Sequence, residues 1–306
     1  MCALHSAHDG QGHSGPRRRS LHMDFGLFTK IVDEISTFRP FPSVGLNYAG
    51  ESLLHPRFLD ALALLKDRGL GSRTGFNTNA TVLRPEIAEA IIDSDVRSVS
   101  ISLDGFQGSH ERIRMGSRYD KVVENTMSLL EARRRRGATN PSIIINLTRV
   151  GQEESEIQAF VDHWAMLADE VRVYEQIAAH SSLVTRNEAI DRVLSTRKPF
   201  CSDPWKYIAV LADGRITLCC HDILGLGGGF DANVAENAIL RVWRSPGYRR
   251  VRHSILAGQF GEIPACRRCE AWAGEYVHED LPTGEYIARR TGLGVSYRRR
   301  EQVPVQ

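Results

Sequence analysis

The chain has 306 residues, of which 42% are hydrophobic and 25% charged, a composition typical of a globular protein with a sizeable core. Its net charge of +2 at pH 7 does not favour nucleic acid as a partner, and we interpret the arginine runs at 17–19, 133–136 and 298–300 as solvated surface. No apolar run approaches the roughly 18 residues of a membrane span, and no apolar signal segment follows Met1, so we expect a cytoplasmic protein with no membrane partner.

Between residues 24 and 174 the chain alternates between two kinds of segment. Short apolar segments predict strands, and amphipathic segments between them predict helices. This order is typical of a parallel sheet built from βα units. The predicted elements are a helix at 24–38, a strand at 44–47, a helix at 56–68, a strand at 74–77, a helix at 84–94, a strand at 98–103, a helix at 120–136, a strand at 142–147, a helix at 153–168 and a strand at 170–174.

The remainder of the chain has a different character. Residues 178–200 are polar and irregular, and we interpret them as a connection between domains. Segments 205–211 and 215–219, joined by an Asp-Gly turn, predict a β-hairpin, and a short helix is expected at 238–243. The last thirty or so residues, 276–306, are basic and have little apolar periodicity, which predicts a loosely ordered tail.

Five of the six cysteines lie in the C-terminal third, which favours metal binding over disulfides in a cytosolic chain. Cys266 and Cys269 are separated by two residues and can bind one metal centre. Cys201, just before the hairpin, and Cys219, at its end, could supply two more thiolates. Cys220 is adjacent to Cys219 on the same predicted strand, so the two side chains would point to opposite sides. Four thiolates suit either a [4Fe–4S] cluster or tetrahedral zinc, and spacing alone does not choose between them.

Several short motifs follow one another along the chain. Met1-Cys2 precedes a polar loop and the first helix, and the next three strands end in the sequences YAGESLLHP at 48–56, NTNAT at 77–81 and SISLDG at 100–105, the last followed by HERIR at 110–114. The pattern Cys201-x12-Gly214-x4-Cys219 then precedes Asn233-Val234 and Cys266-x2-Cys269. In this order, over residues 1–270, the motifs resemble the radical S-adenosylmethionine superfamily with a SPASM/Twitch domain.

The resemblance implies an α/β fold: a partial (β/α)6 TIM-like barrel and a small C-terminal iron–sulfur domain. Cys2 would be the third cysteine of the family's Cys-x3-Cys-x2-Cys motif, so we expect the first strand and two cysteines to lie upstream of this chain. Residues 1–177 would form the core barrel, 201–275 the auxiliary cluster domain and 276–306 the tail. Ala49, Ser52 and Ala80 depart from the family's Gly, Pro and Gly, and the later SPASM cysteines are absent, as in the shorter Twitch form.

The same resemblance implies the cofactors and the residues that bind them. A [4Fe–4S] cluster held by three cysteines, Cys2 among them, binds S-adenosylmethionine and yields a 5′-deoxyadenosyl radical. Gly50 and Glu51 would lie against the methionine amino group, Ser102 and Asp104 would lie at the ligand end of a barrel strand, and Asn79 is a weaker candidate. Cys201, Cys219, Cys266 and Cys269 would hold one auxiliary [4Fe–4S] cluster.

Three functions are compatible with this pattern. A single auxiliary cluster resembles Twitch-type alcohol dehydrogenases, so we expect an oxidoreductase acting on a small molecule or a peptide, with a flavodoxin or ferredoxin as reductant. A peptide-modifying maturase shares the same core. The third alternative is a catalytically inactive, truncated protein that binds an iron–sulfur cluster or zinc.

Overall fold

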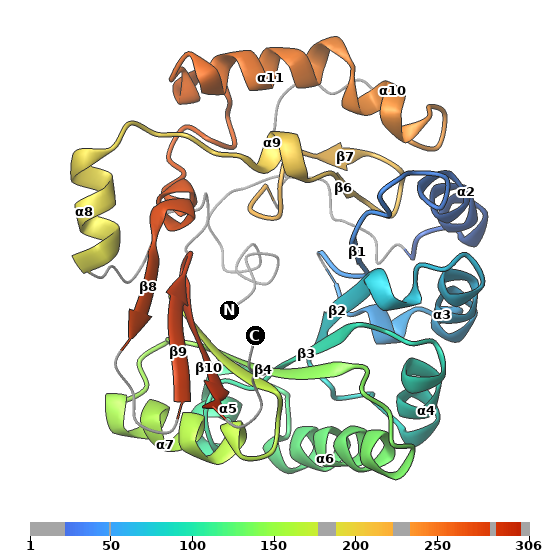
Figure 1. Cartoon of the computed structure of the whole chain (residues 1–306), viewed down its shortest axis with the longest axis vertical. Helices are drawn as coiled ribbons and strands as arrows, with labels where there is room; N and C mark the ends of the chain where they lie inside the picture. Colours follow the sequence, from blue (N-terminus) through green and yellow to red (C-terminus); the bar gives the residue numbers. More distant parts are fainter. Residues whose placement is uncertain (1–21, 49, 177–187, 223–232, 282–285, 301–306) are drawn as a thin grey trace. The chain divides into compact units, whose positions relative to one another are not determined.

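The computed structural model divides the chain into two compact units (Figure 1). The sheet unit comprises residues 35–176 and 278–306, and the cysteine unit comprises residues 1–34 and 177–277. Among the described helices, none combines the length and apolar character that a membrane crossing requires. The described residues are 22–48, 50–176, 188–222, 233–281 and 286–300.

The sheet unit contains the parallel sheet that the sequence predicts. Its strands β1 to β5 pair in chain order, each parallel to the next. The predicted strands and helices of residues 44–174 are all present within a few residues of their expected ends, so the α/β prediction is confirmed. The elements are β1 (Val44–Gly45), α3 (Phe58–Asp67), β2 (Thr74–Thr78), α4 (Pro85–Asp93), β3 (Ser98–Ser102), α5 (Gln107–Ile113), α6 (Tyr119–Arg135), β4 (Ser142–Thr148), α7 (Glu154–Ala165) and β5 (Glu170–Tyr174), with 3₁₀ turns η1 (Ser52–Leu54) and η2 (Gly71–Arg73).

One face of this sheet forms the core. Alternate strand residues such as Val99, Ile145 and Val171 are fully buried and pack with apolar side chains of α3, α4, α6 and α7, including Phe160 and Trp164. Because side chains alternate along a strand, the intervening residues project from the opposite face. On β3, β4 and β5 these intervening residues are largely polar, which provides hydrogen-bonding groups on the sheet face that the core does not use.

The predicted loosely ordered tail is wrong for residues 278–281 and 286–299. These form β8 (His278–Leu281), β9 (Tyr286–Thr291) and β10 (Gly294–Arg299), an antiparallel extension of the sheet in which β10 pairs with β5. Gly294 sits where a Cβ would lie 2.7 Å from the Tyr174 ring, so a larger residue would not fit there. The basic composition conceals the strands because their arginines pair with acids, as Arg298 does with the buried Glu170.

The cysteine unit is built from short elements. The predicted hairpin is present as β6 (Ala209–Val210) and β7 (Ile216–Thr217), and the predicted short helix as α10 (Ile239–Trp243). Helix α2 (Phe25–Ile35) joins this unit, because Lys30 Nζ donates to the backbone carbonyls of Val234 and Asn237. The other elements are α8 (Glu188–Thr196), α9 (Asp203–Lys206), α11 (Pro246–Leu256), η4 (Phe260–Glu262) and η5 (Ala271–Tyr276).

Three helices of this unit, α8, α9 and α11, were not predicted, and α9 includes residues 205–206, where the predicted strand 205–211 was expected to begin. Helix α8 lies inside the segment 178–200, which the sequence suggested to be irregular, so that interpretation is wrong for Glu188–Thr196. Helix α11 begins with a Ser245 N-cap, whose side chain accepts from Tyr248 N, and with Pro246 in the first turn. These are ordinary helix-start signals that a search for apolar periodicity overlooks in so basic a helix.

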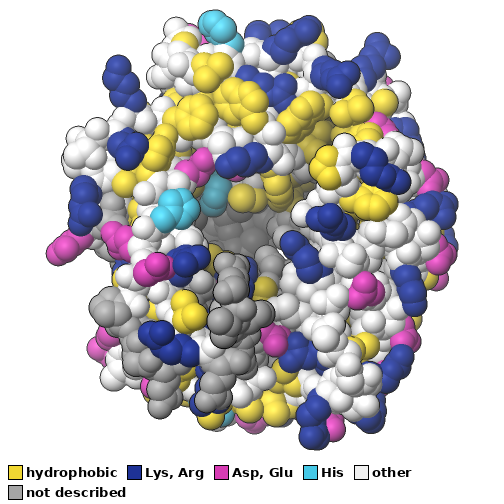
Figure 2. Space-filling model, viewed as in Figure 1, with side chains coloured by type: hydrophobic (Ala, Val, Ile, Leu, Met, Phe, Trp, Pro, Cys, Tyr) yellow, Lys and Arg dark blue, Asp and Glu magenta, His cyan; other side chains and the backbone are white. Residues whose placement is uncertain are grey.

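Basic side chains do not gather in one patch on the face shown in Figure 2, where Asp and Glu side chains lie among them. In the run 133–136, Arg134, Arg135 and Arg136 are exposed and pair with Glu131, Glu89 and Asp93. Their interpretation as solvated surface is confirmed. Arg133 differs, since its side chain is only 16% exposed and pairs with Asp169.

Candidate functional site

Glu51 connects the ends of two neighbouring strands of the sheet unit. Its Oε1 accepts from Thr78 Oγ1 at 2.7 Å, and its Oε2 accepts from the backbone N–H of Asn79 at 2.8 Å. The same carboxylate also caps η1 through Leu53 N at 3.4 Å. The fold therefore brings together Glu51 and Asn79, two of the predicted cofactor-binding residues, although 28 positions separate them.

The turns that carry these residues are open on one side and braced on the other. A Cβ built on Gly50 would meet no atom within 4 Å, so a ligand can approach the backbone there. Ala80 has a left-handed φ of 55°, which explains why a Gly suits this position in the family's turn. Asn125, a buried amide on α6, donates to Ala80 O at 2.6 Å and fixes the turn. Asn125 was not among the predicted site residues, although a polar residue on the buried face of a helix was the available signal.

Ser102 and Asn146 are register partners at the ends of β3 and β4. The Oδ1 atom of Asn146 is buried without a hydrogen-bond partner among the described residues. A buried acceptor without a donor costs roughly 1–3 kcal/mol, so a ligand hydroxyl or N–H at this position would bind favourably. Asn146 was not among the predicted site residues. The alternation of β4 indicates only that it faces away from the core.

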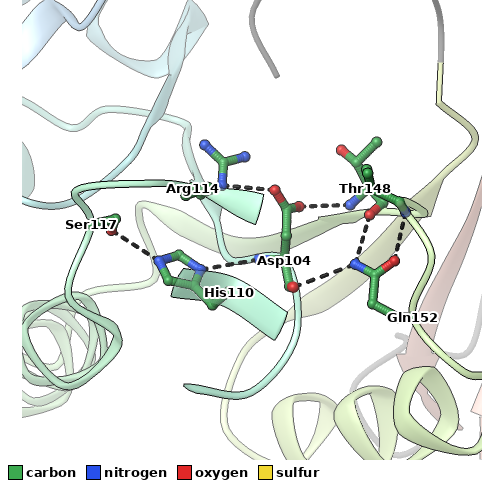
Figure 3. A network of polar contacts seen from close by, with 7 residues as sticks. Asp104, His110, Arg114, Ser117, Thr148 and Gln152 are labelled. Atoms are coloured by element: carbon green, nitrogen blue, oxygen red, sulfur yellow. Dashed lines mark hydrogen bonds and ion pairs between the residues drawn. The ribbon is translucent and has the colours of Figure 1, made fainter. Parts of the chain in front are cut away.

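A buried carboxylate, that of Asp104, joins the end of β3 to the end of β4 (Figure 3). Its Oδ2 accepts from Arg114 Nε at 2.8 Å, and its Oδ1 accepts from the backbone N–H of Thr148 at 2.8 Å. Gln152 Nε2 donates to Thr148 O at 2.9 Å and to Asp104 O at 3.4 Å. Since both carboxylate oxygens have protein partners, the geometry favours a structural role for Asp104. That this residue binds the cofactor stays a prediction.

His110 completes this network from α5 and is fully buried. Its Nδ1 accepts from Asp104 N at 3.3 Å, so the ring proton lies on Nε2, which donates to Ser117 Oγ at 2.9 Å. Burial, and then the charge of Arg114, lower the pKa of His110 below its ordinary 6.5, although Asp104 and Glu111 oppose the shift. The imidazole is therefore neutral at pH 7, the form that makes both bonds.

The turn of the β6–β7 hairpin explains why Gly214 and Asn233 accompany the cysteines in the sequence motif. Gly214 has a φ of 81°, and a Cβ there would lie 2.2 Å from Asn233 Oδ1. Asn233 Nδ2 donates to Asp213 O at 2.9 Å, and Val234 N donates to Gly214 O at 2.9 Å. The Asn-Val pair thus locks the hairpin turn, which needs a glycine for both its backbone conformation and the close approach.

Of the five described cysteines, Cys220 is exposed, and the other four are half-buried. The charge of Cys219 affects the pKa of Cys201, and the charge of Cys269 affects the pKa values of Cys220 and Cys266. The prediction that Cys219 and Cys220 lie on one strand, with side chains on opposite sides, is wrong. Strand β7 ends at Thr217, and both residues lie in the turn that follows. Cys2 lies outside the described residues.

Burial of these thiols favours a centre that carries positive charge. Burial raises the pKa of Cys266 to about 12, and it also raises the pKa values of Cys201 and Cys219. Thiols in such surroundings ionise when a metal centre binds them and neutralises their charge. The set of thiols therefore fits a metal or iron–sulfur centre.

Fold and site together define an α/β protein with a parallel sheet and a separate cysteine-rich unit that fits a metal centre. Residues 2–162, more than half of the chain, match the family model described as the radical SAM superfamily, and residues 201–270 match SPASM, an iron–sulfur cluster-binding domain. The chain belongs to the radical SAM superfamily. The expected cofactors, a [4Fe–4S] cluster and S-adenosylmethionine, are those of these two domains, so that prediction is confirmed.

A curated relative and two solved structures are similar to parts of the chain. The tungsten-containing aldehyde ferredoxin oxidoreductase cofactor-modifying protein of Pyrococcus furiosus is 30% identical over 122 residues, 40% of this chain and 34% of that one. BtrN in complex with AdoMet and 2-DOIA is 14% identical with a TM-score of 0.53, over 84% of this chain and 83% of BtrN. Streptococcus suis SuiB is 15% identical with a TM-score of 0.60, over 82% and 69%. At such identities these two structures support the fold alone.

Replacing His110 by Asn tests the neutral buried imidazole. We expect the variant to be less stable by about 1–3 kcal/mol at pH 7, because it leaves a space and loses the bond to Ser117. The pKa of His110 in the folded protein lies below its unfolded value of 6.5, so the unfolded state binds a proton more readily than the folded state. The wild type therefore loses stability as the pH falls below 6.5, whereas the variant has no such group to protonate. The stability gap in urea unfolding should therefore narrow between pH 7 and about pH 5. His163→Asn, at an exposed position, is the control; an undiminished His110→Asn gap at pH 5 would contradict the assignment.

Proposed function

We propose that the chain is a radical SAM oxidoreductase that carries one auxiliary [4Fe–4S] cluster in residues 201–275. The proposal depends on one observation, the set of half-buried cysteines Cys201, Cys219, Cys266 and Cys269 in one compact unit. Apart from these four, the sequence contains only Cys2 and Cys220, too few for a second auxiliary cluster with four thiolates. When bound, the family's cofactors supply radical chemistry and an electron acceptor.

The residues at the strand ends of the sheet unit are assigned to S-adenosylmethionine. Glu51, with Gly50 beside it, would accept from the methionyl ammonium through lone pairs that Thr78 and Asn79 leave available. Ser102 and Asn146 would bind ribose hydroxyls, since the buried Asn146 Oδ1 needs a donor. Asp104 is assigned a bracing role, because both of its oxygens are bonded to protein. Cys2 would be a ligand of the radical cluster.

The second candidate is modification of a peptide or of another protein's cofactor. SuiB has been solved bound to its precursor peptide SuiA, and that structure has a TM-score of 0.52 to this chain. The Pyrococcus furiosus relative is by name a cofactor-modifying protein. Both are similarities of fold or of part of the chain, so we rank them below oxidation of a small molecule. A flavodoxin or ferredoxin as reductant and a cytoplasmic location belong to either candidate.

Single cysteine variants test which thiols hold the auxiliary cluster. In a Cys2→Ala background, anaerobic reconstitution should give about four irons and four sulfides per chain. Cys219→Ser and Cys266→Ser should each lower that content severely, because a cluster that has lost a thiolate is labile. Cys220→Ser serves as the matched control and should retain the full content. Iron lost from Cys220→Ser and kept by Cys219→Ser would reverse the assignment, and zinc without iron in every chain would refute the cluster.

Replacing Glu51 by Gln tests the methionine site. We expect the affinity of the cluster-loaded protein for S-adenosylmethionine to fall about tenfold, or about 1.4 kcal/mol, since a neutral amide replaces a charged acceptor. Equilibrium dialysis with labelled S-adenosylmethionine measures the change. Glu86→Gln, an exposed change on α4, should bind like the wild type. Equal affinities for the Glu51 variant and the wild type would exclude the assignment.

Anaerobic product analysis tests the reaction class. With a low-potential reductant and S-adenosylmethionine, we expect an alcohol-bearing substrate to lose a pair of hydrogens while 5′-deoxyadenosine accumulates. Mass spectrometry detects both products. An epimerised or cross-linked peptide, with no oxidised small molecule, would instead support the second candidate.

A further inference from the structure

Two carboxylates flank the thiol of Cys201 in the cysteine unit. Asp203 lies in the first turn of α9, and Glu275 lies in η5, shortly after Cys269. The sulfur of Cys201 and one carboxylate oxygen of each acid lie within 4.8 Å of one another, and all three residues are half-buried. Neither acid belongs to the cysteine motif. Their proximity to the predicted first ligand of the cluster was not apparent from the sequence.

Glu275 connects the loop that carries Cys201 to the segment that follows Cys266 and Cys269. Its Oε1 accepts from the backbone N–H of Ser202 at 2.8 Å. Its Oε2 lies 3.9 Å from Lys206 Nζ, and its side chain is 29% exposed. The next backbone N–H, that of Asp203, donates to the thiol of Cys201. Glu275 thus holds the peptide group between Cys201 and Ser202, which is adjacent to the peptide group whose N–H interacts with the sulfur of Cys201.

The charges beside the sulfur favour one oxidation state of a bound cluster. Two carboxylates, those of Asp203 and Glu275, lie beside this sulfur, and one ammonium, that of Lys206, lies 3.9 Å from Glu275. The net charge beside the sulfur is therefore negative. Because the two carboxylates are half-buried, solvent screens this charge incompletely. Since reduction of a cluster adds one electron, nearby negative charge opposes it.

We propose that Glu275, assisted by Asp203, is a positioning residue of the auxiliary cluster that orients Cys201 and lowers the cluster's midpoint potential. The inference rests on the proposed function, because it requires the cluster to be bound in residues 201–275. It adds a determinant of the potential, at positions that the cysteine spacing does not include. Hydrogen bonds around the ligands of a cluster and the net charge nearby are established determinants of its potential.

The test compares amide variants that keep shape and remove charge. Glu275→Gln retains an oxygen that can accept from Ser202 N–H, so the cluster should assemble and only the charge should change. In a Cys2→Ala background, a redox titration followed by electron paramagnetic resonance should give a midpoint potential more positive by about 59 mV or more. That shift is a tenfold change in the ratio of reduced to oxidised cluster for one electron. Asp203→Asn should shift the potential in the same direction.

Controls separate the charge effect from a structural one. Glu236→Gln removes an exposed carboxylate of the same unit and should leave the potential unchanged. Asp203→Glu keeps the charge and should retain a potential close to that of the wild type. Glu275→Ala removes both the acceptor and the charge and should lower the iron content, as expected of a positioning residue.

The outcomes distinguish this inference from the proposed function. An intact cluster whose potential is the same in Glu275→Gln, Asp203→Asn and Glu236→Gln overturns the inference and leaves the proposed function standing. A Cys2→Ala chain that binds no iron overturns both. Iron loss from Glu275→Gln, which keeps the acceptor for Ser202 N–H, would contradict positioning through that hydrogen bond, and so would an unchanged iron content in Glu275→Ala.

Discussion

Strands β2 to β5 bury one face against the helices of the sheet unit, and the candidate cofactor site depends on this constraint. Val99, Ile145 and Val171 are fully buried on that face. Because side chains alternate along a strand, burying these residues directs Ser102 and Asn146 to the other face, at strand ends that lie side by side. Parallel pairing brings the loops after the strands to the same edge, which is where ligand groups gather in barrels of this class.

Two carboxylates, the half-buried Glu51 and the buried Asp104, then hold these strand ends in place. Glu51 connects the end of β1 to the turn after β2, and Asp104 connects the end of β3 to the end of β4. Each accepts backbone N–H groups that would otherwise be unsatisfied near the sheet edge. A carboxylate is effective there because a charged acceptor forms stronger hydrogen bonds than a neutral one. The neutral His110 supports the second of these connections by accepting from Asp104 N and donating to Ser117.

The cysteine unit follows a different principle. Its elements are short, and its thiols have raised pKa values because they are removed from water. Binding a cluster would ionise the thiols, so metal binding and folding of this unit are expected to be coupled. Asp203 and Glu275 add negative charge next to Cys201, which would bias the potential of the bound cluster.

Sequence patterns by themselves determined the order of the strands, and of the helices except α5, from residue 24 to residue 174, together with the cysteine spacing and the family. These features are local: strand and helix periods, turn residues and short motifs are each contained within a few positions. The tertiary structure alone decided that β10 pairs with β5, that Asp104 braces two strand ends, that Asn125 fixes the turn at Ala80, and that Glu275 lies beside Cys201. Each of these depends on contacts between residues far apart in the chain. A charged or polar residue reads as surface in a linear sequence until folding supplies the partner that buries it.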